Sequence, residues 1–156
     1  MALVRILVDG YSLLHAWPEL AAGQPRYSAG AREQLINRLT QYRDACGTPI
    51  TVVFDGATTA QGFSPFPSTP EMEIIYSRSG QTADQLIERV AHRLSSYGEV
   101  LVVTDDFAER ETVVSVGGMF VGCLGFIQTV ENASAEMAAD LKRLNRNERV
   151  KFNRSR

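Results

Sequence analysis

Residues 3–12 read Leu-Val-Arg-Ile-Leu-Val-Asp-Gly-Tyr-Ser, a short apolar run that ends abruptly in an acid and a glycine. A run of this length, rich in valine, isoleucine and leucine, predicts a buried strand. In open α/β sheets, ligands bind in the crevice at the carboxyl ends of the strands. Asp9 therefore occupies the position at which such a sheet places its functional groups.

Two later segments end in the same way. A strand predicted over 50–54 runs into Asp55, and another predicted over 100–104 runs into Asp105 and Asp106. The carboxyl ends of parallel strands meet at one edge of a sheet. The sequence thus predicts a sheet edge that is lined with acids.

The segment from Thr82 to Tyr97 has the strongest helical pattern in the chain. Thr82 and Gln85 fit the spacing of a capping box, Gly98 ends the pattern, and Asp84 lies in the first turn. The predicted apolar stripe of this helix consists of Ala83, Leu86, Ile87, Val90, Ala91, Leu94 and Tyr97. Asp84 is therefore a fourth acid that can reach the same edge.

The remaining segments alternate between helical and extended patterns. We expect a short helix stopped near Pro18, a helix from Ser28 to about Cys46, a strand over 72–76, a helix over 107–116, an edge strand over 119–121 and a last helix over 124–144. Strands that alternate with helices predict an α/β fold, with a mostly parallel central sheet and helices on both faces. We find no internal repeat and no second domain.

The last predicted helix carries Phe126, Val130, Met137, Leu141 and Leu144 at helical spacing, and we expect this stripe to lie in the core. The uncharged segment 112–130 is long enough to resemble a membrane span. Four glycines and several polar residues divide it, which favours a helix end, a turn, an edge strand and a new helix instead.

The composition is that of a globular protein, with 44% hydrophobic and 22% charged residues in 156. Cys46 and Cys123 have no metal-ligand spacing, which favours free thiols in a reducing compartment. The chain enters a strand directly, without the succession of a signal peptide, so we expect a cytoplasmic location. The segment from Gly56 to Pro70, rich in glycine and proline, predicts a long loop, either a functional flap or a surface excursion.

The charge is uneven along the chain. From Lys142 onward there are seven basic residues and one acid, whereas the preceding 141 residues hold nine basic and seventeen acidic side chains. An acidic body with a basic tail is compatible with a polyanionic partner and a metal site. The alternative is a solvated, frayed C-terminus.

Familiar catalytic motifs are absent from the sequence. It contains no phosphate-binding loop and no dinucleotide fingerprint, and Ser12 is not in a nucleophile elbow. His15 and His92 are too few and too far apart in the sequence to indicate a zinc site, and we expect His92 to be solvated.

The acids remain as the candidate site. Asp9, Asp84 and Asp106 can converge if the helix of Asp84 begins at the edge where the strands end. Hard oxygen ligands suit Mg²⁺ or Mn²⁺, and such a site supports phosphodiester hydrolysis by activating a water. Each acid also has a structural interpretation: Asp84 can favour the helix dipole, Asp106 can cap a helix, and Asp9 and Asp55 can belong to turns.

Several blocks of the sequence resemble a known family. They are Asp9-Gly-Tyr-Ser, Trp17-Pro-Glu-Leu, Val52-Val-Phe-Asp, Gln81-Thr-Ala-Asp and Val103-Thr-Asp-Asp. Together they resemble the YacP-like branch of the NYN domains, from the start of the chain to about Leu144. The resemblance implies a PIN-like ribonuclease with a Rossmann-like three-layer α/β/α fold. It also implies a metal-dependent endoribonuclease that acts on messenger RNA in connection with ribosomes.

The resemblance also assigns roles to individual acids. Asp9 matches the first metal carboxylate of the family, Asp84 the acid of the Thr-Ala-Asp block, Asp106 the last acid, and Asp55 the acid after the second strand. The family usually has asparagine where this chain has Ser12. Serine has no amide donor, so a weakened or binding-only member is the alternative.

Our leading hypothesis is a small cytoplasmic endoribonuclease, with a nuclease domain over 1–144 and a basic tail over 145–156. Asp9, Asp84 and Asp106 would hold Mg²⁺ or Mn²⁺, with Asp55 as a supporting acid. The residues expected to contact RNA are Tyr11, Ser12, Arg78, Lys142, Arg143 and Arg146. The alternatives are a non-catalytic RNA- or ribosome-binding module and a phosphatase of small molecules, although the latter lacks an Asp-x-Asp pair after the first strand.

Overall fold

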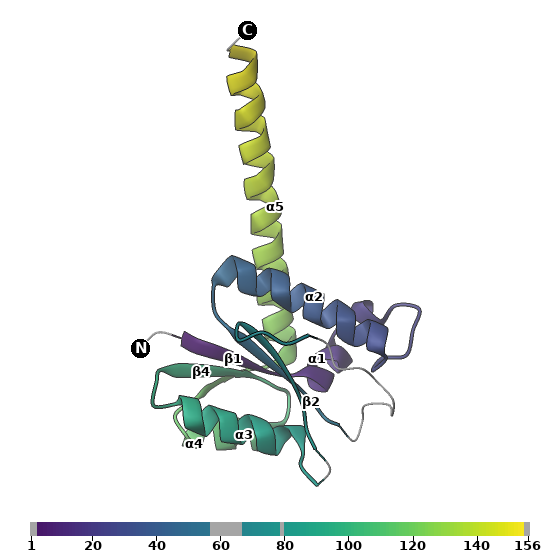
Figure 1. Ribbon diagram of the computed structural model, residues 1–156, viewed down its shortest axis with the longest axis vertical. Coiled ribbons are helices and arrows are strands. Elements are labelled where there is room, and N and C mark those ends of the chain that lie inside the picture. Colours follow the sequence, from purple (N-terminus) through teal and green to yellow (C-terminus); the bar gives the residue numbers. More distant parts are fainter. Residues whose placement is uncertain (1–2, 57–66, 79, 155–156) are drawn as a thin grey trace.

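The structure is a computed structural model that describes residues 3–56, 67–78 and 80–154 (Figure 1). The five strands are β1 (Leu3–Asp9), β2 (Ile50–Phe54), β3 (Met72–Tyr76), β4 (Glu99–Val103) and β5 (Met119–Val121). The helices are α1 (Gly10–Ala16), α2 (Ala29–Cys46), α3 (Ala83–Leu94), α4 (Phe107–Ser115) and α5 (Cys123–Arg154), with a 3-10 helix at Pro18–Ala21.

The strands form one parallel sheet in the order β3-β2-β1-β4-β5. β1 is central, and its Val8 is in register with Val52 of β2 and Val103 of β4. After β1, the chain adds β2 and then β3 on one side of it, and then returns to add β4 and β5 on the other side. The strand order reverses between β1 and β4, which is the topological switch point where open α/β sheets bind ligands.

Helices cover both faces of the sheet, as the sequence predicts. α1, α2 and α5 pack on one face around a core that includes Leu35, Phe54 and Phe126, and α3 and α4 pack on the other around Val53 and Ile87 (Figure 1). All five of these side chains are essentially inaccessible to solvent. The predicted three-layer α/β/α fold is therefore confirmed.

The predicted capping box of α3 is present, but the helix is shorter than expected. The Thr82 hydroxyl accepts a hydrogen bond from the backbone N–H of Gln85, and the Gln85 side chain accepts one from the backbone N–H of Thr82. The helix ends at Leu94, and Tyr97 lies in the following turn with 75% of its surface exposed. Including Tyr97 in the apolar stripe was therefore wrong, because the helix ends before the stripe reaches it.

The last helix departs most from the sequence prediction. α5 continues to Arg154, ten residues beyond the predicted end, and extends away from the sheet (Figure 1). Phe126 is buried as expected, whereas Leu141 is 56% and Leu144 is 59% exposed. The expectation that the whole stripe lies in the core was wrong, because helical periodicity does not reveal where a helix extends beyond the elements that it packs against.

The uncharged segment 112–130 is divided among the end of α4, β5 and the start of α5, as predicted. Within the described residues, no helix combines the length and the apolar character needed to cross a membrane. The flap predicted over 56–70 includes residues 57–66, which lie outside the described residues. Residues 155–156 of the basic tail also lie outside them.

Candidate active site

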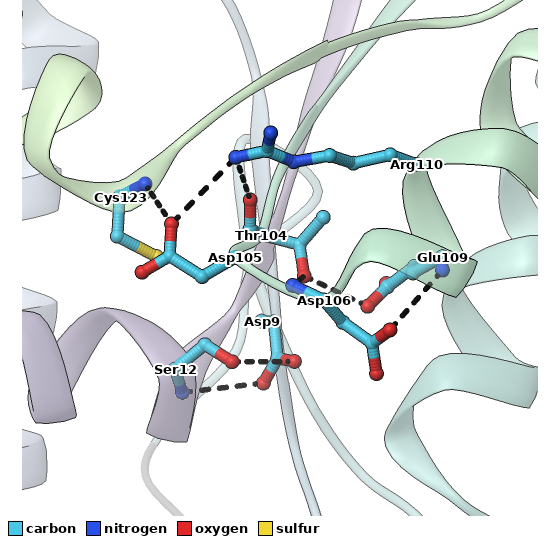
Figure 2. A network of polar contacts seen from close by, with 8 residues as sticks. All are labelled: Asp9, Ser12, Thr104, Asp105, Asp106, Glu109, Arg110 and Cys123. Atoms are coloured by element: carbon cyan, nitrogen blue, oxygen red, sulfur yellow. Dashed lines mark hydrogen bonds and ion pairs between the residues drawn. The ribbon is translucent and has the colours of Figure 1, made fainter.

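Asp9 lies at the carboxyl end of β1 and is the N-cap of α1. Its carboxylate accepts hydrogen bonds from the Ser12 hydroxyl at 2.9 Å and from the Ser12 backbone N–H at 3.4 Å (Figure 2). The first residue of α1 is Gly10, and a Cβ there would lie 2.4 Å from the Phe54 ring. Glycine therefore lets the helix start directly at the strand end, which holds Asp9 at the edge of the sheet.

Three carboxylates from three different elements meet at this edge. One oxygen each of Asp9 on β1, Asp84 in the first turn of α3 and Glu109 in the first turn of α4 lie within 4.8 Å of one another. Glu109 is buried, and the Thr104 hydroxyl donates a hydrogen bond to its Oε2 atom at 2.9 Å. We call Asp9, Asp84 and Glu109 the carboxylate cluster. It is the only group of this kind found among the described residues.

Glu109 was not among the site residues that the sequence predicted. Its spacing from Asp106 is that of a capping box, which is a structural role. The signal that could have identified it is its place in the first turn of a helix that follows a strand ending in acids. In a sheet of this kind, the first turns of such helices border the same crevice as the strand ends.

The close approach of the three acids changes their proton affinities. Burial, together with the negative charges of Asp84 and Asp106, raises the pKa of Asp9 from 3.8 to about 6, against the opposing effect of the Ser12 hydrogen bonds. Burial and the neighbouring Asp84 raise the pKa of Glu109 far above its usual range. The pKa of Asp84 is also raised, first of all by burial. Without a cation, the cluster therefore retains protons that isolated carboxyl groups would release.

Asp106 caps α4, which is the structural interpretation considered for it above. Its carboxylate accepts hydrogen bonds from the backbone N–H groups of Ala108 at 2.9 Å and Glu109 at 3.3 Å. It also lines the same cavity as Asp9 and Asp84. The structure thus places Asp106 at the predicted site, while Glu109 takes the third place in the carboxylate cluster.

The other two acids at the strand ends have different surroundings. Asp55 lines the cavity, and the hydroxyl of Ser77 lies 3.5 Å from its Oδ1 atom. Asp105 accepts a hydrogen bond from the backbone N–H of Cys123 at 2.9 Å and lies 3.9 Å from the guanidinium of Arg110 (Figure 2). Asp105 therefore ties the end of β4 to the first residue of α5.

The acids surround an open cavity of about 510 Å³. Its lining consists of Asp9, Tyr11, Ser12, His15, Tyr27, Asp55, Thr82, Ala83, Asp84, Asp105 and Asp106. Tyr11 and Ser12, both predicted to contact substrate, are in this lining, although Tyr11 is only 7% exposed and packs against Phe54. Five of the eleven lining residues are acids, which suits a cation and a phosphate group better than an apolar ligand.

The structure does not bring the predicted basic contacts to this cavity. Arg78 is exposed between β3 and α3 and is not among the lining residues that the structure describes. Lys142, Arg143 and Arg146 lie on the exposed part of α5. At about 1.5 Å per residue, Arg146 is roughly 24 Å along the helix axis beyond Val130, the last fully buried residue of α5.

The fold and the site together define a Rossmann-like α/β/α domain with an acidic site at its topological switch point. The chain belongs to the YacP-like NYN domain family, whose model matches residues 6–155. The NYN domains are part of the PIN-like nuclease superfamily, so the family indicates a nuclease, and thus a hydrolase.

Two comparisons with known proteins agree with this assignment. The chain is 26% identical over 140 residues to the uncharacterized protein YacP of Bacillus subtilis (strain 168), covering 89% of this chain and 82% of that protein. It also resembles the crystal structure of Rae1 (YacP) from Bacillus subtilis, with a TM-score of 0.78 and 25% identity, covering 95% of this chain and 84% of that one. A mutant form of the same protein gives a TM-score of 0.77, again at 25% identity, and covers 92% of this chain and 84% of that one.

Proposed function

We propose that the protein is a metal-dependent endoribonuclease that cleaves single-stranded RNA. The observation that carries this proposal is the meeting of Asp9, Asp84 and Glu109, with oxygens within 4.8 Å of one another. Asp9 and Asp84 also line the acidic cavity, and the fold is that of a nuclease family. Holding three acids close together raises their pKa values and disfavours their charged forms in the folded state. This arrangement has no evident benefit for folding alone. Their arrangement is typical of a site that binds a cation.

The cluster fits a divalent metal with oxygen ligands. All its donors are carboxylates, which suit Mg²⁺ and Mn²⁺. The buried Oε1 atom of Glu109 accepts no hydrogen bond from the described residues, so it has an acceptor to offer. Asp9, Asp84 and Glu109 would hold the ion, and Asp106 is the further acid that we predict to share it.

The residues of the chain prepare this site for hydrolysis. When bound, the metal lowers the pKa of a water and neutralises charge on the scissile phosphate. The hydroxyls of Ser12 and Thr104 hold the carboxylates of Asp9 and Glu109 in place by hydrogen bonds of 2.9 Å. Ser12, at the position where relatives usually have asparagine, therefore orients the carboxylate of Asp9. Asp55, on the wall of the same cavity, can accept a proton from the attacking water.

The basic residues would act on RNA outside the cavity. We infer that Lys142, Arg143 and Arg146 on α5 contact phosphates distant from the cleaved bond. Arg78, between β3 and α3, would contact a phosphate nearer to the body of the domain than these three do. Such contacts contribute affinity that decreases with salt and carry no base preference. A cytoplasmic location and messenger RNA at the ribosome as the substrate remain part of this proposal.

The test is cleavage of an end-labelled single-stranded RNA with Mn²⁺ or Mg²⁺. The variant Asp84→Asn keeps the size of the side chain and removes the charge that a metal needs. We expect its rate to fall about 100-fold or more, because metal catalysis contributes several kcal/mol. The matched control is Glu88→Gln, an exposed acid on the same helix, and we expect its rate to be unchanged.

The outcomes separate the nuclease from its alternative. Cleavage that requires metal and is lost only in Asp84→Asn supports the proposal. Equal background rates in both variants and the natural protein, with RNA binding retained, would select the non-catalytic binding module. The experiment is repeated with ribosomes if naked RNA is not cleaved.

A further inference from the structure

An exposed aromatic groove lies beside the acidic cavity, on α4 and β5. Phe107 is 73% exposed and Phe120 is 40% exposed, although aromatic side chains of this size usually contribute to a core. The groove has a volume of about 350 Å³. Its lining consists of Phe107, Arg110, Glu111, Val114, Ser115 and Phe120, and we call it the Phe107 groove.

A single guanidinium connects this groove to the acidic cavity. Arg110 lies with its guanidinium carbon 4.9 Å from the ring centre of Phe120 and 5.9 Å from that of Phe107. The same guanidinium lies 3.9 Å from Asp105 and 3.5 Å from the carbonyl oxygen of Thr104 (Figure 2). The groove and the cavity therefore meet at Arg110.

The chain keeps space for this guanidinium. A Cβ at Gly122 would lie 3.0 Å from the Nη2 atom of Arg110 and 3.4 Å from Asp105. Any larger residue would push against the guanidinium from the side of α5. The guanidinium of Arg110 therefore lies close to the backbone between β5 and α5.

The chemistry of the groove fits a planar base. Aromatic faces and an arginine are the groups on which single-stranded nucleic acids stack their bases. A volume of about 350 Å³ is at the lower end of the roughly 300–1,000 Å³ typical of small-ligand sites, which suits one planar group. Phe107 directly follows Asp106, which lines the cavity, so a base in the groove would belong to a nucleotide close to the scissile phosphate.

We propose that the Phe107 groove binds one base of the single-stranded substrate, next to the cleaved phosphodiester, by stacking on Phe107 and Arg110. This inference rests on the proposed function, since it assumes an RNA strand in the acidic cavity. It assigns a substrate subsite to residues that the metal chemistry does not use. Stacking of this kind tolerates all four bases, in agreement with the lack of any base-reading pattern in the sequence.

The experiment measures binding of a short fluorescent RNA by anisotropy in the presence of a chelator, so that no cleavage is needed. The RNA is compared with copies in which one nucleotide at a time is abasic. We expect one abasic position to weaken binding to the natural protein about 5- to 150-fold, which corresponds to loss of one stacked base. In Phe107→Ala, we expect this position to lose its special effect.

Two further variants make the test specific. Tyr97→Ala removes an aromatic residue of similar exposure, 75%, located before β4 and thus at the opposite edge of the sheet, and should bind all the RNAs as the natural protein does. Phe107→Leu removes the aromatic ring but keeps much of the side-chain volume and preserves the fold of the protein. It should bind RNA as weakly as Phe107→Ala does. A Phe107→Leu variant that binds with natural affinity would overturn stacking.

The remaining outcomes are also decisive. The proposal is overturned if Phe107→Ala binds every RNA as the natural protein does. It is also overturned if that variant weakens all RNAs equally, with the abasic effect intact. RNA binding that depends on Phe107 without any metal-dependent cleavage would retain the subsite and reject the nuclease. Metal-dependent cleavage that is insensitive to Phe107→Ala would retain the nuclease and reject the subsite.

Discussion

In the absence of divalent metal, we expect the substitution Asp9→Asn to stabilise the protein at pH 8. Asp9 is 9% exposed, and its pKa is raised from 3.8 to about 6 by burial and by the charges of Asp84 and Asp106. The folded state therefore favours the protonated form of Asp9 more strongly than the unfolded state does. The stability that this group contributes is fully present below about pH 4 and is lost as the pH rises through about 6.

The size of the effect follows from the shift. A change of about two pKa units corresponds to about 3 kcal/mol between low and high pH. Asparagine removes the charge but weakens the hydrogen bonds that Ser12 makes with this side chain, at a cost of about 1 kcal/mol. We thus expect a net gain of about 2 kcal/mol at pH 8 and a small loss at pH 4.

The assay is urea denaturation followed by tryptophan fluorescence or circular dichroism, in a chelator, at both pH values. The control is Asp44→Asn, which removes an exposed acid, 59% accessible and paired with Arg43, and should change the free energy of unfolding by about 0.5 kcal/mol or less at either pH. A variant Asp9→Asn that is destabilised at pH 8, or shifted equally at both pH values, would refute the reasoning that charge crowding opposes folding at this site.

Three other predictions concern the site and the core. Mn²⁺ at about 100 times its dissociation constant should stabilise the natural protein by about 2.7 kcal/mol, and a thermal shift assay should show little effect in Glu109→Gln. Phe126→Ala should cost about 3–5 kcal/mol because this ring is buried, whereas Leu141→Ala, on the exposed part of α5, should cost less than about 0.5 kcal/mol; urea denaturation compares the two, and equal losses would contradict the fold. Gly10→Ala should destabilise by about 1–3 kcal/mol, measured in the same way, because its Cβ would overlap the Phe54 ring; a stabilised variant would contradict that contact.

Local patterns were sufficient to predict most elements of the fold. The run that ends at Asp9 and the capping box of Thr82 and Gln85 are short-range signals, and both appear in the structure where they were expected. The apolar stripe of α5 is equally regular, yet only its first part meets the body. Helix periodicity reports which side chains share a face, but the partner of that face is set by the positions of other elements. The exposure of Leu141 and Leu144 therefore could not be read from the pattern.

The site was predictable to the extent that strand ends carry it. The sequence predicts that Asp9, Asp84 and Asp106 converge if the helix of Asp84 begins at the edge where the strands end. The structure brings Asp9 and Asp84 together with Glu109, and Asp106 lines the same cavity as the first two. Glu109 was missed because its role depends on burial and on the Thr104 hydroxyl, both of which are tertiary properties. Asp106, three residues earlier, is also an acid and lines the cavity, so sequence alone does not rank the two.

The length of α5 gives the molecule two parts whose order has different origins. Up to Val130 the helix is fixed by burial, whereas from residue 135 every described side chain is exposed. Met137 and Leu141 still line a pocket together with residues of α2. An exposed helix as short as the roughly 13 residues beyond them is only marginally stable in water and forms and melts within about a microsecond. The outer part of α5 should therefore lose its helical structure on heating well before the body unfolds cooperatively. A ligand that binds this part only in its helical form must offset the free energy of helix formation, which becomes less favourable on heating. Its affinity will therefore decrease with temperature more steeply than that of a ligand in the acidic cavity.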